Sequence, residues 1–220
     1  MTETPSSPPR PHGRARSVAE QFHEVYYESG VWRNTFWQGV ETWKCPLDLW
    51  VYQEIMFERR PDVVVECGTA AGGSALFLAS VCDLLGHGRV VSVDVEAREG
   101  RPAHPRVKYL LGSSVAPQVV GEVRAEVEGA RRVMVILDSD HRREHVLGEL
   151  AAYAGLVTPA DYLIVEDTNV NGHPVLHHFG PGPMEAVAEF LNGRDDFAAD
   201  REREKFFLTF NPRGYLRRVR

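Results

Sequence analysis

The fold is decided by one stretch of the sequence, Val63-Val64-Val65-Glu66-Cys67-Gly68-Thr69-Ala70-Ala71-Gly72-Gly73-Ser74. Its β-branched run, bounded by glycine, is typical of a buried parallel strand. The glycines that follow allow a sharp turn and let a ligand approach the backbone closely. A helix beginning near Ser74 would then point its free N–H groups at that ligand. The stretch therefore predicts a nucleotide-type cofactor site at the carboxyl end of a parallel sheet.

Strands and helices alternate along the rest of the chain. Strands are predicted over 62–67, 89–94, 106–111, 132–138 and 161–166, and helices over 73–85, 116–128, 141–154 and 183–192. Such alternation predicts an α/β fold with a doubly wound, mostly parallel sheet of seven strands and helices on both faces. Residues 205–210 and 215–219 flank the turn-forming tetrapeptide Asn211-Pro212-Arg213-Gly214. We therefore expect them to close the sheet as a C-terminal antiparallel hairpin.

The region before the sheet divides into a tail and a cap. Residues 1–16 are rich in Pro, Ser and Arg, which favours a disordered N-terminal tail, with a transit peptide as the alternative. Helices are predicted over 17–29, with Ser17 as N-cap, and over 46–58, with Pro46 in the first turn. We expect residues 17–60 to form a helical cap on a Rossmann-like core of residues 61–220, so that 17–220 is a single domain.

The segment between those two helices is rich in aromatic residues. Residues 31–45 carry Trp32, Phe36, Trp37 and Trp43 in a loop-like context. We favour a hydrophobic cover over the sheet edge or a dimer contact for this segment. The alternative is a lid or a wall of an acceptor pocket.

The overall composition is that of a soluble globular protein. Of the 220 residues, 43% are hydrophobic and 25% are charged, which is ordinary for this class. The net charge of −6 argues against a nucleic-acid partner, and no apolar run approaches the about 20 residues needed to cross a membrane. Cys45, Cys67 and Cys82 lack metal-type spacing, and the N-terminus lacks a signal-peptide core. We therefore expect a cytoplasmic protein with reduced thiols.

The glycine spacing and the acids at the strand ends distinguish two cofactor classes. A dinucleotide fingerprint needs a glycine where Ala70 stands, and Glu66 would repel a pyrophosphate. The same carboxylate suits the ammonium and sulfonium groups of S-adenosylmethionine. Asp94 is placed to bind the ribose hydroxyls, and the alternative is that both acids serve only a helix dipole and a turn. The predicted cofactor-binding residues are Glu66, Gly68, Thr69, Ala70, Gly72, Gly73, Ser74, Asp94, Ser113, Ser114 and Asp138.

A second group of acids follows the fourth and fifth predicted strands. Asp138 and Asp140 follow one strand, and Glu166 and Asp167 follow the other, so the carboxylates should meet at the ligand-binding crevice. A hard divalent cation, Mg²⁺ first, would remove the cost of their repulsion. It would also lower the pKa of an acceptor hydroxyl, and His141 would take the proton as catalytic base. We expect Asp138 to be the first ligand and Asp140 its substitute, because Asp140 also looks like a helix N-cap. The alternative is that these residues only cap and pack against the helix.

A long loop over residues 167–183 carries His173, His177 and His178. Long ordered loops are often functional, so these side chains are candidates for an acceptor wall, with plain surface as the alternative. An iron oxygenase would need two histidines and a carboxylate as ligands, and the sequence pattern gives that possibility little support.

Seven motifs occur in order from about residue 30 to the C-terminus. They are Lys44-Cys45-Pro46-Leu47-Asp48, residues 66–74, Leu137-Asp138-Ser139-Asp140-His141, Val165-Glu166-Asp167-Thr168, Gly172-His173-Pro174-Val175, Gly180-Pro181-Gly182-Pro183 and Asn211-Pro212-Arg213-Gly214-Tyr215-Leu216. In this set the chain resembles the cephalosporin hydroxylase family, which is similar to the rhamnosyl O-methyltransferases and has the class I methyltransferase fold.

The resemblance implies S-adenosylmethionine bound by residues 66–74 and Asp94, and Mg²⁺ held by Asp138 or Asp140 with Glu166 and Asp167. It also implies a homo-oligomer. The fold and the site favour methyl transfer over the oxidation in the family's name. We therefore expect a Mg²⁺-dependent O-methyltransferase that acts on a hydroxyl of a small natural product or its sugar. The alternatives are a hydroxylase or methoxylase component, or a non-catalytic partner protein, of an antibiotic biosynthetic pathway.

Overall fold

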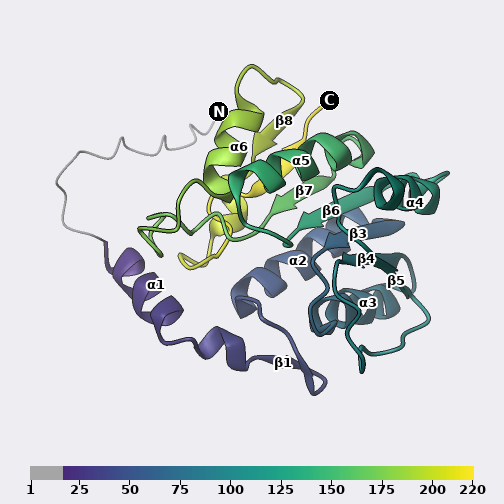
Figure 1. The fold of residues 1–220 in the computed structure, drawn as a ribbon, viewed down its shortest axis with the longest axis horizontal. Coiled ribbons are helices and arrows are strands. Elements are labelled where there is room, and N and C mark those ends of the chain that lie inside the picture. The colour runs from purple at the N-terminus through teal and green to yellow at the C-terminus, as the bar shows by residue number, and fades with distance from the viewer. Residues whose placement is uncertain (1–16) are drawn as a thin grey trace, which may run out of the picture.

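A seven-stranded sheet forms the centre of the computed structural model, which describes residues 17–220 (Figure 1). The strands stand in the order β5-β4-β3-β6-β7-β9-β8. They are β3 (Val63–Cys67), β4 (Arg89–Asp94), β5 (Val107–Leu111), β6 (Val133–Leu137), β7 (Tyr162–Val165), β8 (Phe197–Ala199) and β9 (Tyr215–Arg218). The strands from β3 to β7 pair in parallel, and β9 is antiparallel to both of its neighbours. The predicted doubly wound, mostly parallel sheet is thus confirmed.

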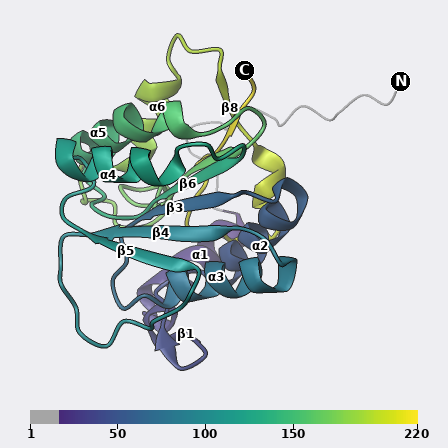
Figure 2. The same ribbon diagram turned by 90° about the vertical axis from the view of Figure 1, so that its right-hand side faces the viewer.

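Helices cover both faces of this sheet, as the view in Figure 2 shows. One face carries α4 (Pro117–Val127), α5 (Arg143–Tyr153) and α6 (Pro183–Leu191), and the other carries α2 (Pro46–Arg59) and α3 (Gly73–Leu85). Side chains alternate along each strand, so Val65 joins the apolar cluster under α4 to α6 while Val64 joins the cluster under α2 and α3. Because both faces are covered, the central strands β6 and β7 are continuous apolar runs rather than alternating ones. No helix among residues 17–220 is long and apolar enough to cross a membrane.

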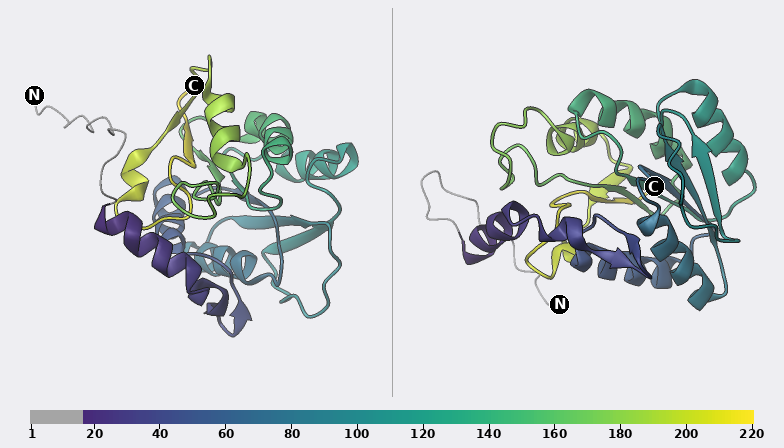
Figure 3. Two further views of the ribbon diagram at one scale, coloured as in Figure 1. Left: turned by 60° about the vertical axis from the view of Figure 1, so that its left-hand side comes forward. Right: turned by 60° about the horizontal axis from the view of Figure 1, so that its bottom comes forward.

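The N-terminal segment packs across the C-terminal one. α1 (Val18–Glu28) begins as predicted, since Ser17 Oγ accepts from the N–H of Glu20 and Glu20 accepts in return from the N–H of Ser17. It is followed by the 3₁₀ helix η1 (Val31–Asn34) and a short hairpin of β1 (Phe36–Trp37) and β2 (Val40–Glu41), where a loop was expected. Figure 3 shows α1 beside the yellow C-terminal segment. The tail predicted over 1–16 lies outside the described residues.

The partner of the last strand differs from the prediction. β8, not residues 205–210, pairs with β9, and the 3₁₀ helix η3 (Arg201–Glu204) follows β8. Residues 205–210 form no strand, and Phe210 is instead buried against the aromatic rings of Tyr26 and Tyr27 in α1. The backbone N–H of Phe210 donates to the buried Asp48 carboxylate at 2.8 Å, so it is not available to a strand ladder. The predicted turn at 211–214 is present, since Gly214 N donates to Asn211 O at 2.9 Å.

The three cysteines lie in the interior of the described structure. Cys45, Cys67 and Cys82 are all free and buried. Burial is the first cause that raises the pKa of each thiol above its usual value. They are therefore unreactive core residues, as expected of reduced thiols.

His23 connects α1 to the loop that follows β7. Its ring stacks on Phe210, with centroids 5.8 Å apart and an interplanar angle of 8°, and the side-chain amide of Asn169 donates to its Nε2 at 2.9 Å. Burial lowers the pKa of His23 to about 4, although the charge of Glu24 opposes this. His23 is therefore neutral in the folded protein at neutral pH.

We predict that α1 makes the protein acid-sensitive through His23. The unfolded histidine, with a pKa near 6.5, takes up a proton before the folded one does. The free energy of unfolding should therefore be fully retained above pH 6.5 and fall by up to about 3 kcal/mol by pH 4. Urea unfolding across this range would measure it, and His23→Gln should remove that part of the pH dependence. An identical pH dependence in both proteins would contradict the prediction.

Candidate active site

The carboxyl ends of β3, β6 and β7 bring the predicted acids to one edge of the sheet. The first residue after β6 and the first after β7 continue the backbone hydrogen bonds between neighbouring strands. Asp138 N donates to Cys67 O at 2.8 Å, and Glu166 N donates to Leu137 O at 2.9 Å. β4 and β6 lie on opposite sides of β3, which makes this the switch point at which ligands bind in such sheets.

Two cavities share walls at this edge. The β4 cavity has a volume of about 370 Å³ and lies over the end of β4. The Trp cavity has a volume of about 230 Å³ and lies between the glycine loop and the N-terminal segment. Residues that line the β4 cavity alone include Asp94, Gly112 and Ser114, and those that line the Trp cavity alone include Trp32, Trp43, Lys44, His141 and Asp167. Gly68, Ala70, Asp138 and Ser139 line both. A ligand in one cavity would therefore face a ligand in the other across Gly68 and Asp138.

Asp94 holds the glycine loop in place. Its Oδ2 accepts from the backbone N–H groups of Thr69 at 3.0 Å and Ala70 at 2.8 Å, and Arg101 Nη2 lies 3.2 Å away. Gly68 has a φ of +100° and sits so close to the next strand that a Cβ there would lie 1.9 Å from the backbone oxygen of Asp138. The turn thus requires glycine at residue 68 both for its conformation and for its contact with β6.

Glu66 lies below this loop rather than in either cavity. It is fully buried, and Ser92 Oγ donates to its Oε2 at 2.6 Å. Burial raises the pKa of Glu66, while the positive charge of Lys44 opposes that rise. Its other oxygen, Oε1, is buried without a well-formed hydrogen bond within residues 17–220, although the nearby Ser74 hydroxyl also opposes the rise in the pKa of Glu66. The predicted cofactor contact of Glu66 therefore stays a prediction, supported by that unpaired oxygen.

The other predicted cofactor residues divide between the two cavities. Ser114 is buried at the wall of the β4 cavity, and its Oγ lies 3.1 Å from His145 Nε2. Thr69, Gly73 and Ser74 line the Trp cavity, whereas Gly72 and Ser113 line neither cavity.

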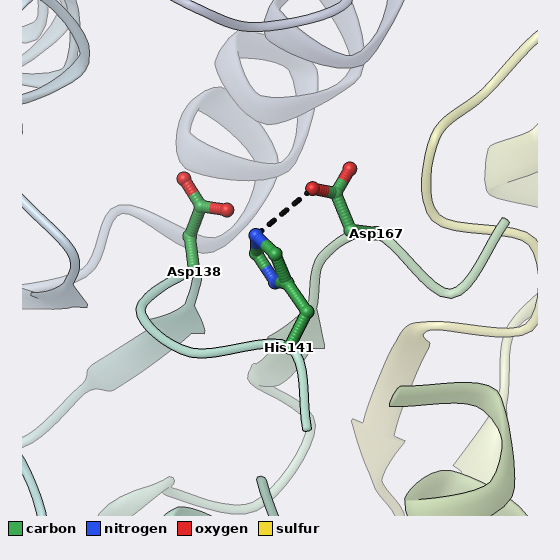
Figure 4. A group of neighbouring side chains, drawn as sticks. All are labelled: Asp138, His141 and Asp167. Atoms are coloured by element: carbon green, nitrogen blue, oxygen red, sulfur yellow. Dashed lines mark ion pairs between the residues drawn. The ribbon is translucent and has the colours of Figure 1, made fainter. Parts of the chain in front are cut away.

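Asp138, His141 and Asp167 come together at the floor of the Trp cavity (Figure 4). One ligand atom from each lies within 4.8 Å of the others, and His141 Nε2 is 3.1 Å from Asp167 Oδ2. Burial is the first cause that raises the pKa of Asp167, the charge of Asp138 adds to it, and His141 opposes it. An iron oxygenase needs two histidines and one carboxylate, whereas this group has one histidine and two carboxylates. Carboxylate oxygens suit a hard cation such as Mg²⁺.

Asp140 and the start of α5 differ from the prediction. The N-cap of α5 is Arg142, and the helix begins at Arg143 rather than at 141. The Asp140 carboxylate instead accepts from the backbone N–H and the guanidinium of Arg142, both at 2.9 Å. These hydrogen bonds lower the pKa of Asp140 to about 2. The N-cap assignment was wrong, and Asp140 lies outside the three-residue group of Figure 4.

Lys44 is the site residue that sequence reasoning missed. Its Nζ donates to Glu166 Oε1 at 2.5 Å and to Asp138 Oδ2, and the side chain is only 4% exposed. Burial alone would lower the pKa of Lys44, but the charges of Asp138 and Glu166 raise it above its usual value. Glu166 is thus held by an ammonium and lies outside the group formed by Asp138, His141 and Asp167. The sequence signal that could have indicated a buried role for Lys44 is its position between Trp43 and the start of α2 at Pro46.

The aromatic residues of the N-terminal segment have two roles. Trp37 packs on Phe77 of α3 with ring centroids 4.9 Å apart, and its Nε1 donates to Ser80 Oγ at 3.0 Å, so it covers α3 rather than the predicted sheet edge. Trp32 and Trp43 instead line the Trp cavity, which favours the pocket-wall alternative for them. The predicted histidine wall is not seen, because His173, His177 and His178 line neither cavity.

Comparison with known proteins identifies the family. The sequence profile described as Rhamnosyl O-methyltransferase/CmcI matches residues 29–219. The chain belongs to this family. A relative named Rhamnosyl O-methyltransferase, from Mycobacterium leprae (strain TN), is 41% identical over 206 residues, which cover 91% of this chain and 90% of the relative. The family resemblance inferred from the seven motifs is thus confirmed.

Solved structures of the Rhamnosyl O-methyltransferase/CmcI family support the fold. An apo structure of CmcI superposes with a TM-score of 0.66 at 22% identity, covering 98% of this chain and 90% of that one. A CmcI structure with Mg and SAM gives a TM-score of 0.61 at 22% identity, covering 86% of this chain and 78% of that one. The class I methyltransferase fold expected from the sequence is therefore confirmed.

The close contact between Gly68 and Asp138 leads to a prediction about stability. Gly68→Ala would place a methyl group against the Asp138 backbone at an unfavourable φ, so it should destabilise the protein by about 3 kcal/mol. Gly121→Ala is a matched control, because Gly121 lies inside α4 with no atom within 4 Å of the added Cβ. It should stabilise by about 0.5–1 kcal/mol. Chemical denaturation would test both, and equal effects would contradict the geometry.

Proposed function

We propose that this protein transfers a methyl group from S-adenosylmethionine to a hydroxyl on the sugar of a small natural product, with Mg²⁺ bound at Asp138. The observation that carries this proposal is the shared wall of the two cavities. Gly68 and Asp138 line both, so a methyl donor in the β4 cavity would face an acceptor in the Trp cavity. The names of the relatives as rhamnosyl O-methyltransferases, and the CmcI structure with Mg and SAM, support the same chemistry.

The β4 cavity fits the nucleoside end of the cofactor. Asp94 at the end of β4 would take the ribose hydroxyls, and Gly112 and Ser114 would border the adenine. The unpaired Glu66 oxygen lies below the glycine loop and would attract the cofactor's ammonium group. The same buried carboxylate would repel a pyrophosphate, which disfavours a dinucleotide.

The floor of the Trp cavity fits a divalent cation. Asp138 and Asp167 offer carboxylate oxygens within one small group, as Mg²⁺ prefers. Bound there, Mg²⁺ supplies Lewis acidity toward the acceptor hydroxyl, and S-adenosylmethionine supplies the methyl group. His141 lies in the same group, with its Nε2 3.1 Å from Asp167 Oδ2. With Asp167 engaged by the cation, the neutral imidazole would have Nε2 free to take the hydroxyl proton. With the proton on His141, the acceptor oxygen would be free to attack the methyl group, and the neutral thioether of the spent cofactor would be the leaving group.

The walls of the Trp cavity indicate the kind of acceptor. The exposed indole of Trp43 offers a broad apolar surface beside the carboxylates. The Trp32 ring lines the same cavity but is packed by Tyr27 and Arg33. A deoxysugar such as rhamnose presents both a C–H face for such rings and hydroxyls for the polar floor. A rhamnosylated small molecule is therefore the first acceptor to test. A homo-oligomer remains a prediction, which light scattering would measure.

We predict that two neighbouring acids behave differently when neutralised. Asp138→Asn should lower methyl transfer by about 100-fold or more, because the metal and the shared cavity wall both depend on it, while S-adenosylmethionine still binds. Asp140→Asn is the comparison variant. Asp140 lines the β4 cavity but is engaged by Arg142 and lies outside the metal group, so the loss of its charge should lower activity far less. Turnover with a rhamnosylated phenol and calorimetric titration of the cofactor would measure both effects. Loss of cofactor binding in Asp138→Asn with metal binding intact would overturn the assignment.

A further inference from the structure

We propose that Lys44 is a counter-ion built into the metal site, which pairs with Asp138 and Glu166 and competes with the cation for Asp138. The inference rests on the proposed function in one respect, that a divalent cation binds at Asp138. It adds a residue that sets the affinity of that site and explains how the acids stay together without metal.

The contacts of Lys44 place its ammonium among the ligands themselves. Nζ lies 2.5 Å from Glu166 Oε1 and also donates to Asp138 Oδ2. Asp138 is at the same time a member of the three-residue group that could hold a metal ion. The Asp138 carboxylate is thus both the partner of the Lys44 ammonium and a ligand of the proposed cation.

The two positive charges would oppose each other across Asp138. The side chains of Lys44 and Glu166 are only 4% and 5% exposed, and that of Asp138 is 20% exposed, so water screens the repulsion only in part. An ammonium has three donors and no acceptor, so it cannot serve as a metal ligand. A cation entering at Asp138 must therefore displace Lys44 or bind beside it at a cost in affinity.

Lys44 also has room to withdraw. The residue lines the Trp cavity, so the flexible four-carbon side chain can move its ammonium toward that space. Its backbone stays fixed, because Lys44 N donates to Thr42 O at 2.8 Å and α2 begins two residues later. Metal entry would therefore move one side chain and leave the glycine loop unchanged.

The test compares Mg²⁺ binding to three proteins by calorimetric titration without cofactor. Lys44→Met keeps most of the length of the side chain and removes its charge. Lys205→Met makes the same substitution at a surface lysine that pairs with Glu54, and so controls for net charge. We expect Lys44→Met to bind Mg²⁺ about tenfold or more tightly than the wild type, and Lys205→Met to bind it unchanged.

Thermal unfolding gives a second readout that does not depend on activity. Without metal, Lys44→Met should melt below the wild type, because the buried Glu166 carboxylate and the partly buried Asp138 carboxylate lose their counter-ion. Added Mg²⁺ should raise its melting temperature more than that of the wild type. Should Lys44→Met fold only when Mg²⁺ is present, the cation would have replaced the ammonium, which supports the proposal.

The remaining outcomes separate this inference from the proposed function. Equal or weaker Mg²⁺ binding by Lys44→Met, with normal binding by the wild type, would overturn the role of Lys44 and leave the methyltransferase proposal standing. A Lys44→Met protein that stays unfolded at saturating Mg²⁺ would overturn the role as well. Absence of Mg²⁺ binding in all three proteins would overturn both the inference and the metal site.

Discussion

The site depends on the balance of charge where neighbouring parallel strands end. Glu66 on β3, Asp138 after β6 and Glu166 after β7 all act on the one buried ammonium of Lys44. Because the carboxyl ends of adjacent strands lie side by side, the fold places these acids together even though their negative charges repel. A cation must therefore be present for the edge to be stable, and Lys44 supplies it from the N-terminal segment. The contact that places Lys44 of the N-terminal segment against the sheet is therefore also the contact that completes the site.

Much of this edge could be predicted from the sequence, because the signals are local. Valine runs mark the strands, and an acid directly after a strand has only one edge of the sheet to occupy. Lys44 could not be placed in this way, since it is 94 residues from Asp138 and 122 from Glu166 along the chain. Asp140 was misassigned for the opposite reason, because Arg142, two residues away, engages its carboxylate.

Packing across the chain also decided the elements that were predicted wrongly. Residues 205–210 are rich in aromatic residues and precede a turn, as a strand of a hairpin would, yet Phe210 is buried against α1 and its N–H donates to Asp48. Trp32 and Trp37 look alike in sequence, and only the tertiary structure separates a cavity wall from a cover over α3. The presence of several acids is by itself no evidence of catalysis, because Lys44 compensates two of them. The stronger argument is that Asp138 stands between two cavities.

The claim at the centre of this account is that the glycine loop and its neighbouring acids bind S-adenosylmethionine. Calorimetric titration of the purified protein with S-adenosylmethionine and with NAD, each with and without Mg²⁺, tests it most directly. We expect S-adenosylmethionine to bind and NAD not to bind, because the buried Glu66 carboxylate attracts an ammonium and repels a pyrophosphate. Binding of NAD, or of neither compound, would contradict the account and favour a redox or non-catalytic role.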